Sequence, residues 1–250
     1  MQADPKAVET AVAGYREAVV WAPEDPGARA RLLRALMFQG QYVVEDEDAQ
    51  REHFDAARLL AEEGFERLAH RLGGAQALEG LEPGDRAAQL RKLCDEAGWS
   101  PRDLAALHFW GAVAWGHWAD RVGGFKAARE GVAGVLRILA GTALELDETY
   151  MDAGPHRFLG RLHSEAPRIP FVTGWVDRDQ AVRHLDRAVE LAPGEPENVL
   201  FLAEALLEHH PKRSDEAREL LRGLAKRRPR PDHLLEDTTT LTRVEELLGG

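Results

Sequence analysis

Prolines that follow a polar or small residue divide the chain into helix-length segments. The spacing of these prolines constrains the fold more than any other feature of the sequence. They stand at Pro5, Pro26, Pro101, Pro155 and Pro196, each where a first helical turn would begin. Leu and Ala dominate the segments between them, and no window alternates polar and apolar residues for long enough to propose a strand. The sequence therefore predicts an all-α fold.

The predicted helices fill most of the chain. Two stretches rich in Gly and Pro, Gly73–Asp85 and Ala166–Asp177, are predicted to be loops. The helices are expected near 5–21, 26–44, 48–72, 86–97, 101–120, 124–146, 149–164, 177–192, 196–209, 214–228 and 233–248.

A repeat of tetratricopeptide length, about 34 residues, runs through this pattern. In such a repeat a proline follows the second helix, which carries a small, a large and a small residue at fixed positions. Before Pro193 these residues are Ala181, Leu185 and Ala188. Before Pro23 they are Ala11, Tyr15 and Ala18, and before Pro229 they are Ala217, Leu221 and Leu224. Small residues at these positions let two helices approach closely. We expect tetratricopeptide-like helical repeats in a single right-handed superhelical or bundle-like domain over 1–250. Antiparallel pairs are expected at 5–21 with 26–44 and at 177–192 with 196–209, with Gly160 and Ala181 at one helix crossing.

Composition excludes several classes of function. The 32 basic and 43 acidic residues give a net charge of −11, which argues against nucleic acid as a partner. Cys94 is the single cysteine, so the chain forms no internal disulfide. The longest uncharged run, Leu104–Ala119, is too short to span a bilayer. No signal peptide is predicted at Met1–Pro5. Two explanations are open: the protein is cytoplasmic, or its native leader was replaced by a start Met.

Signals for catalysis are weak, and neither a metal nor a cofactor is predicted. No nucleophile, phosphate-binding or dinucleotide motif is present in the sequence. His156 and His163 share a helix face, but a rise of about 10.5 Å separates them. A third acid or histidine converging on both would favour an enzyme.

The segment 101–120 is apolar on every side and holds half of the six tryptophans, Trp110, Trp115 and Trp118. A helix of this kind is buried on all sides, which is the simpler interpretation. The alternative is that these rings line an apolar ligand site together with Phe158 and Trp175, the second of which falls in the loop 166–177.

Three motifs follow one another in a fixed order. They are His108-Phe109-Trp110-Gly111-Ala112 with Trp115-Gly116, then Leu146-Asp147-Glu148-Thr149-Tyr150, then Gly154-Pro155-His156-Arg157. With these motifs, the segment from Ala105 to Leu207 resembles the T-component family of TRAP transporters. The resemblance implies hidden tetratricopeptide-like repeats, a periplasmic or otherwise extracytoplasmic location, homotrimeric assembly, and a partnership with a solute-binding protein. It also implies an internal channel for apolar ligands.

From this resemblance we expect a non-enzymatic accessory protein that binds a solute-binding protein of a TRAP transporter and an apolar small molecule. The alternative is a cytoplasmic tetratricopeptide scaffold for protein–protein interaction. An enzyme is the third hypothesis.

Overall fold

The computed structural model describes residues 4–123, 127 and 131–249, and these residues form α-helices and two 3-10 helices without a strand. The predicted all-α class is confirmed. The chain divides into two compact units, Gln2–Tyr150 and Met151–Gly250, called here the N-terminal and C-terminal units. Each is described by itself, and the single domain over 1–250 stays a prediction. Among the helices of the described residues, none has the length and apolarity needed to cross a membrane.

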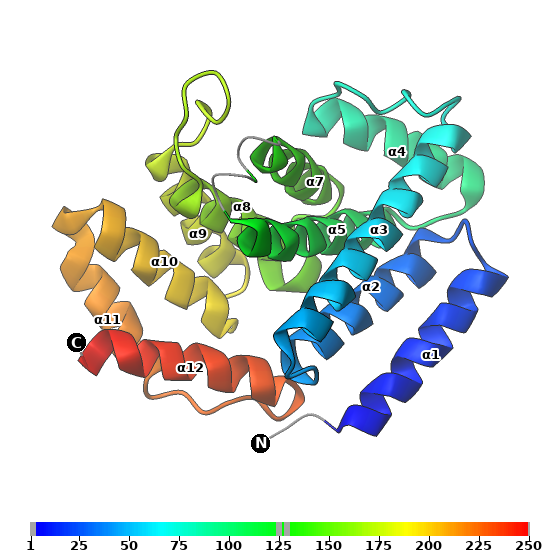
Figure 1. The fold of residues 1–250 in the computed structure, drawn as a ribbon. Coiled ribbons are helices and arrows are strands. Elements are labelled where there is room, and N and C mark those ends of the chain that lie inside the picture. The colour runs from blue at the N-terminus through cyan, green and yellow to red at the C-terminus, as the bar shows by residue number, and fades with distance from the viewer. Residues whose placement is uncertain (1–3, 124–126, 128–130, 250) are drawn as a thin grey trace. The chain divides into compact units, whose positions relative to one another are not determined.

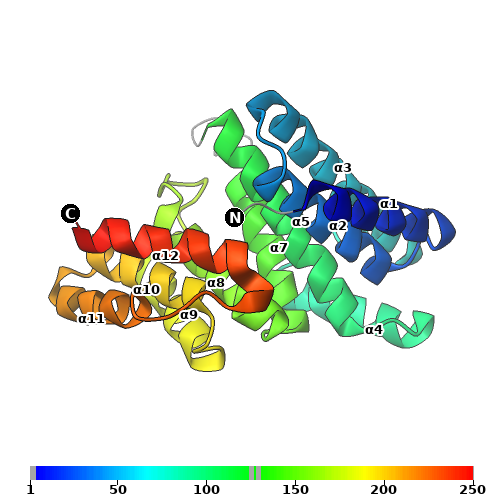
Figure 2. The ribbon, with the colours of Figure 1, turned by 90° about the horizontal axis from the view of Figure 1, so that it is seen from below.

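The N-terminal unit is built around one central helix. Its helices are α1 (Pro5–Trp21), α2 (Pro26–Tyr42), α3 (Glu47–Arg71), α4 (Pro83–Ala97), α5 (Pro101–Val122) and α7 (Val132–Leu146). Helix α5 packs against α2, α3, α4 and α7, and it lies between α3 and α7 in both Figure 1 and Figure 2. Its apolar residues on every side are explained by this central position.

The C-terminal unit packs around α10. Its elements are α8 (Tyr150–Glu165), α9 (Arg178–Leu191), α10 (Pro196–His209), a 3-10 turn at Pro211–Arg213, α11 (Ser214–Leu224), a second 3-10 turn at Pro231–His233 and α12 (Leu234–Gly249). Helix α10 contacts α9, α11 and α12 (Figure 2). Leu185, Leu206 and Leu221 are fully buried or nearly so at these contacts.

Capping explains most helix starts. The side chains of Asp4, Asp25 and Ser100 accept hydrogen bonds from backbone N–H groups of the first turns of α1, α2 and α5, and a proline follows each. The predicted pairs α1 with α2 and α9 with α10 are neighbours joined by short turns (Figure 1).

Two predicted boundaries differ from the structure by three or more residues. Helix α4 begins at Pro83 and not near residue 86, because Pro83 occupies the first turn and its ring lies against α7 at Gly141. Helix α11 ends at Leu224 and not at 228, and Arg227 beyond it donates hydrogen bonds to the carbonyls of Pro193 and Gly194. Of the predicted helix 124–146, residues 124–126 and 128–130 lie outside the described residues, and the described helix begins at Val132.

The predicted helix 149–164 contains a left-handed segment. Met151, Asp152 and Ala153 have φ angles of 51°, 55° and 62°, so the right-handed part of α8 begins after Ala153, at the predicted Gly-Pro start. Arg157 and Asn198 donate hydrogen bonds to the carbonyl of Asp152. These side chains hold a conformation that non-glycine residues rarely adopt.

The expected crossing of Gly160 with Ala181 is confirmed. A Cβ added at Gly160 would lie 2.5 Å from Leu185 Cγ and 3.2 Å from the carbonyl oxygen of Ala181. We predict that Gly160→Leu destabilises the C-terminal unit by about 1–3 kcal/mol through overpacking. Urea unfolding followed by circular dichroism measures this, with Gly223→Leu as control because a Cβ there meets no atom within 4 Å. Equal stability of the two variants would contradict the tight crossing.

Candidate ligand pocket

The three tryptophans of α5 have different surroundings, although all are half-buried. Trp110 donates a hydrogen bond to the hydroxyl of Tyr150 at 2.9 Å. Trp115 and Trp118 meet edge to face with ring centroids 5.5 Å apart, and the guanidinium of Arg58 lies over both rings. Trp110 therefore packs against the core of the N-terminal unit. Trp115 and Trp118 form a cluster with Arg58 further along the helix.

A pocket of about 490 Å³ opens beside Trp115 within the N-terminal unit. This volume is in the usual range for small-molecule sites. Apolar side chains of α3, α5, α7 and the loop before α4 form most of its wall, with four charged residues among them. The lining residues are Phe65, Leu78, Leu81, Trp115, Val135, Ile138 and Leu139, together with Gly80 and Gly134, and the charged residues Glu62, Glu79, Glu82 and Arg86.

Phe65 supports the wall of the pocket because α5 has a glycine opposite it. A Cβ at Gly111 would lie 2.6 Å from Phe65 Cζ, so this glycine permits close packing. The Phe65 ring also contacts the imidazole of His108, with centroids 5.0 Å apart. His108 is fully buried, and its Nδ1 bonds the carbonyl of Leu104 at 2.8 Å, so Nδ1 carries the proton.

The electrostatics behind this wall are unusual. Burial, reinforced by the positive charge of Arg86, lowers the pKa of His108 to about 3, so the ring is neutral. His108 Nε2 and Arg86 Nε are both buried without a hydrogen-bond partner among the described residues. Buried polar atoms without partners are few in native proteins, and each calls for an explanation.

The acids of the pocket have different partners. Glu82 accepts two hydrogen bonds from Arg137, at 2.8 and 3.0 Å, and Glu62 pairs with Arg58. Glu79 is exposed on the loop. Negative charge at the pocket is therefore compensated by arginines or screened by solvent.

A histidine cluster lies in the C-terminal unit. His184 of α9 approaches both His156 and His163 of α8, with Nδ1 of His156 and Nδ1 of His184 2.9 Å apart. The chain thus has the converging third histidine that would favour an enzyme. However, a separation of 2.9 Å between the two nitrogens is that of a hydrogen bond, with one proton between them. Within the described ranges, no group of three His, Cys, Asp or Glu side chains could hold a metal ion.

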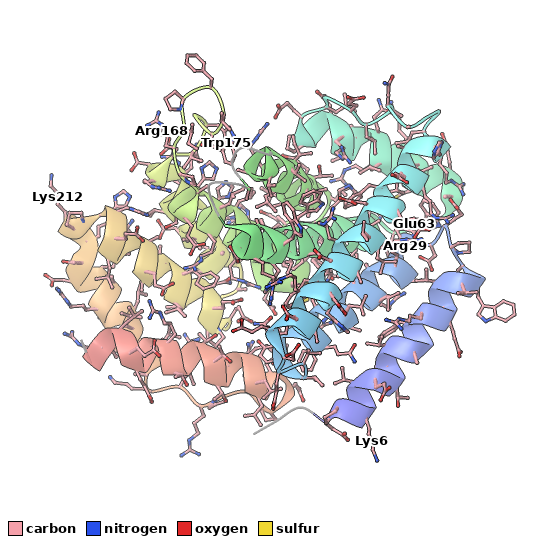
Figure 3. All side chains as sticks on the ribbon, viewed as in Figure 1. Lys6, Arg29, Glu63, Arg168, Trp175 and Lys212 are labelled. Atoms are coloured by element: carbon pink, nitrogen blue, oxygen red, sulfur yellow. The ribbon has the colours of Figure 1, made fainter. Side chains whose placement is uncertain are left out.

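Trp175 closes one side of this cluster. It lies in the predicted loop before α9, and its ring meets His163 edge to face at 5.3 Å; Figure 3 labels Trp175 beside Arg168 of the same loop. Phe158 is half-buried on α8. The five predicted site residues therefore divide between the two units, and a single site that joins them stays a prediction.

Sequence reasoning missed most of the pocket wall. Arg86, the 78–82 loop and the α7 residues carried no motif, although Leu78 and Leu81 are apolar residues inside a stretch of turn-forming ones. Large apolar side chains in a predicted loop were the one sequence signal that could have indicated that this loop lines a pocket.

The family model of the TRAP transporter T-component matches residues 35–228, which include every residue that lines the pocket. The protein is thus an accessory component of a transporter rather than a member of a known enzyme family. The chain belongs to the TRAP transporter T-component family. No curated protein matches the chain.

Proposed function

We propose that this protein is a non-enzymatic, extracytoplasmic accessory protein that binds a solute-binding protein of a TRAP transporter and holds an apolar small molecule beside Trp115. One observation carries the ligand proposal: a largely apolar pocket of about 490 Å³ inside the family-matched region. Family membership supports the transport role. Mixing the protein with the solute-binding protein of the same transporter in sedimentation equilibrium tests both that partnership and homotrimeric assembly.

Gly134 offers a way to fill the pocket without disturbing the fold. It lies in the wall on α7, and a Cβ added there meets no atom within 4 Å. A leucine side chain would therefore enter open space, and replacing glycine within a helix gains up to about 1 kcal/mol of stability.

We predict that wild-type protein binds the neutral dye Nile red saturably, that decanol displaces the dye, and that Gly134→Leu weakens dye binding by about tenfold or more. Dye emission measures binding, and circular dichroism measures folding. The matched control is Gly14→Leu on α1, where an added Cβ also meets no atom within 4 Å. Absent dye binding, or equal binding by both variants, would contradict the pocket as the ligand site.

The same titration tests the predicted aromatic residues one by one. Trp115→Ala removes a ring from the wall, and we expect it to weaken binding. Trp110→Ala, Trp118→Ala, Phe158→Ala and Trp175→Ala decide whether the wider predicted set belongs to the site. Trp21→Ala is the control for the loss of a ring, since Trp21 is 87% exposed on α1.

A further inference from the structure

The loop between α8 and α9 carries the most exposed large apolar side chain of the described residues. Phe171 is 106% exposed, and Val172 beside it is 47% exposed. Pro170 is exposed as well, so the loop ends in three consecutive apolar residues that face solvent (Figure 1). Single exposed apolar residues are common on protein surfaces, but a contiguous apolar tip indicates an interaction site.

The backbone around this tip is fixed by hydrogen bonds. Thr173 is 1% exposed, and its hydroxyl donates to the carbonyl of Pro167 and accepts from the N–H of Ile169. The N–H of Thr173 also donates to the carbonyl of Ile169, at 2.8 Å. At the base of the loop, Arg178 donates to the carbonyl of Ala166 at 3.2 Å. The tip is therefore pre-organised, which lowers the entropic cost of binding.

The conformation of Phe171 is one that the fold itself does not need. Its φ angle of 65° lies in the left-handed region, which is rare for an aromatic residue. Its ring is fully exposed and meets no other ring or cation among the described residues. Backbone strain of this kind is found at binding sites and switch regions. We infer that the ring contacts something outside the C-terminal unit.

The size and chemistry of the tip fit a lipid surface better than a protein. A specific protein interface takes about 20–30 residues on each side, whereas a fluid acyl layer accepts a small apolar tip without a complementary pocket. Arg168 is exposed beside the tip and has no carboxylate partner among the described residues (Figure 3). Apolar residues next to such a cation are typical of a segment that lies at a phospholipid interface.

We propose that Pro170–Val172 insert into the interfacial layer of a phospholipid bilayer, with Arg168 at the level of the lipid phosphates. This contact goes beyond the proposed function, because none of its residues lines the pocket. The net charge of −11 is unfavourable at an anionic bilayer, so the apolar tip provides the attraction and a zwitterionic lipid suffices.

Co-sedimentation with phosphatidylcholine vesicles tests the proposal. We expect the wild-type protein to bind saturably, and Phe171→Ser to weaken binding about tenfold or more. Arg168→Gln should weaken it about two- to fivefold. Trp21→Ser is the matched control, because it removes a ring that is 87% exposed outside this loop, and it should leave binding unchanged. Circular dichroism checks the fold of each variant.

A fluorescent label locates the contact without relying on a loss of binding. Cys94 is buried, so an environment-sensitive nitrobenzoxadiazole label reacts selectively at Phe171→Cys. Vesicles should shift the emission of this label to the blue. The same label at Lys212→Cys, an exposed position of the same unit, should not respond.

Three outcomes would overturn the proposal. The first is that wild-type protein fails to bind vesicles at saturating lipid. The second is an equal loss of binding in Phe171→Ser and Trp21→Ser, since general adsorption of exposed rings would then explain it. The third is a label at Phe171→Cys that responds to the solute-binding protein but not to vesicles, which would make the tip a protein contact. None of these outcomes depends on whether the pocket holds a ligand.

Discussion

Arg230→Met is expected to destabilise the C-terminal unit by about 3–5 kcal/mol, because it removes the charged partner of a buried carboxylate. Asp237 on α12 is 1% exposed. It accepts hydrogen bonds from the backbone N–H, Nε and Nη2 of Arg230 at 2.8, 2.9 and 2.7 Å. Burial raises the pKa of Asp237, and the hydrogen bonds from Arg230 outweigh burial, so its pKa lies below the usual value.

Arg230 also reaches Glu195, the residue that caps α10, at 3.0 Å. The pair therefore ties the start of α12 to the start of α10. Urea unfolding followed by circular dichroism measures the effect. Arg243→Met is the matched control: Arg243 pairs with Glu204 and Glu246 but is itself exposed, and an exposed ion pair contributes little to stability. Equal losses in the two variants would contradict the importance of the buried pair.

His108 and His184 together are expected to lower the free energy of unfolding by about 4 kcal/mol when the pH falls from 7.5 to 5. Burial and the charge of Arg86 lower the pKa of His108 to about 3. Burial and the neighbouring charges of His156, His163 and Arg183 lower the pKa of His184 to about 4. In the unfolded chain both side chains titrate near pH 6.5.

The sign follows from proton binding. Below pH 6.5 the unfolded chain takes up protons that the folded protein refuses, so stability falls as the pH falls until the folded pKa values are reached. At pH 7.5 both histidines are neutral in both states. His108→Met should make the pH dependence shallower by about 2 kcal/mol over this interval. His70→Gln, a change at an exposed histidine, is the control. An unchanged slope in His108→Met would contradict the assignment.

Much of the fold was predictable because local signals and packing agree. Asp4 and Asp25, each followed by proline, fixed the starts of α1 and α2, and the spacing of Gly160 and Ala181 anticipated a real helix crossing. The failures are places where contacts distant in sequence decide. Pro83 lies in a helix because it packs on α7, and Met151–Ala153 are left-handed although no glycine or asparagine marks them.

The candidate site was predictable in one residue and not in its surroundings. Trp115 was predicted to line a ligand site because it lies on the apolar helix at 101–120, and it does line the pocket. The opposite wall comes from α7 and the 78–82 loop, which no local pattern connects with α5. Arg86 is one of many arginines in the sequence, and its place in the pocket wall depends on the packing of α4 against α7. That property exists in the folded unit and not in a motif.

The most direct measurement of the central claim is a crystal structure of the protein soaked with 10-bromodecanol, in which anomalous scattering locates the bromine. We expect one bromine peak inside the pocket among Leu78, Trp115 and Ile138. Crystals of Gly134→Leu treated in the same way should show no peak there. An empty pocket at saturating ligand, or bromine bound elsewhere in both proteins, would contradict the account.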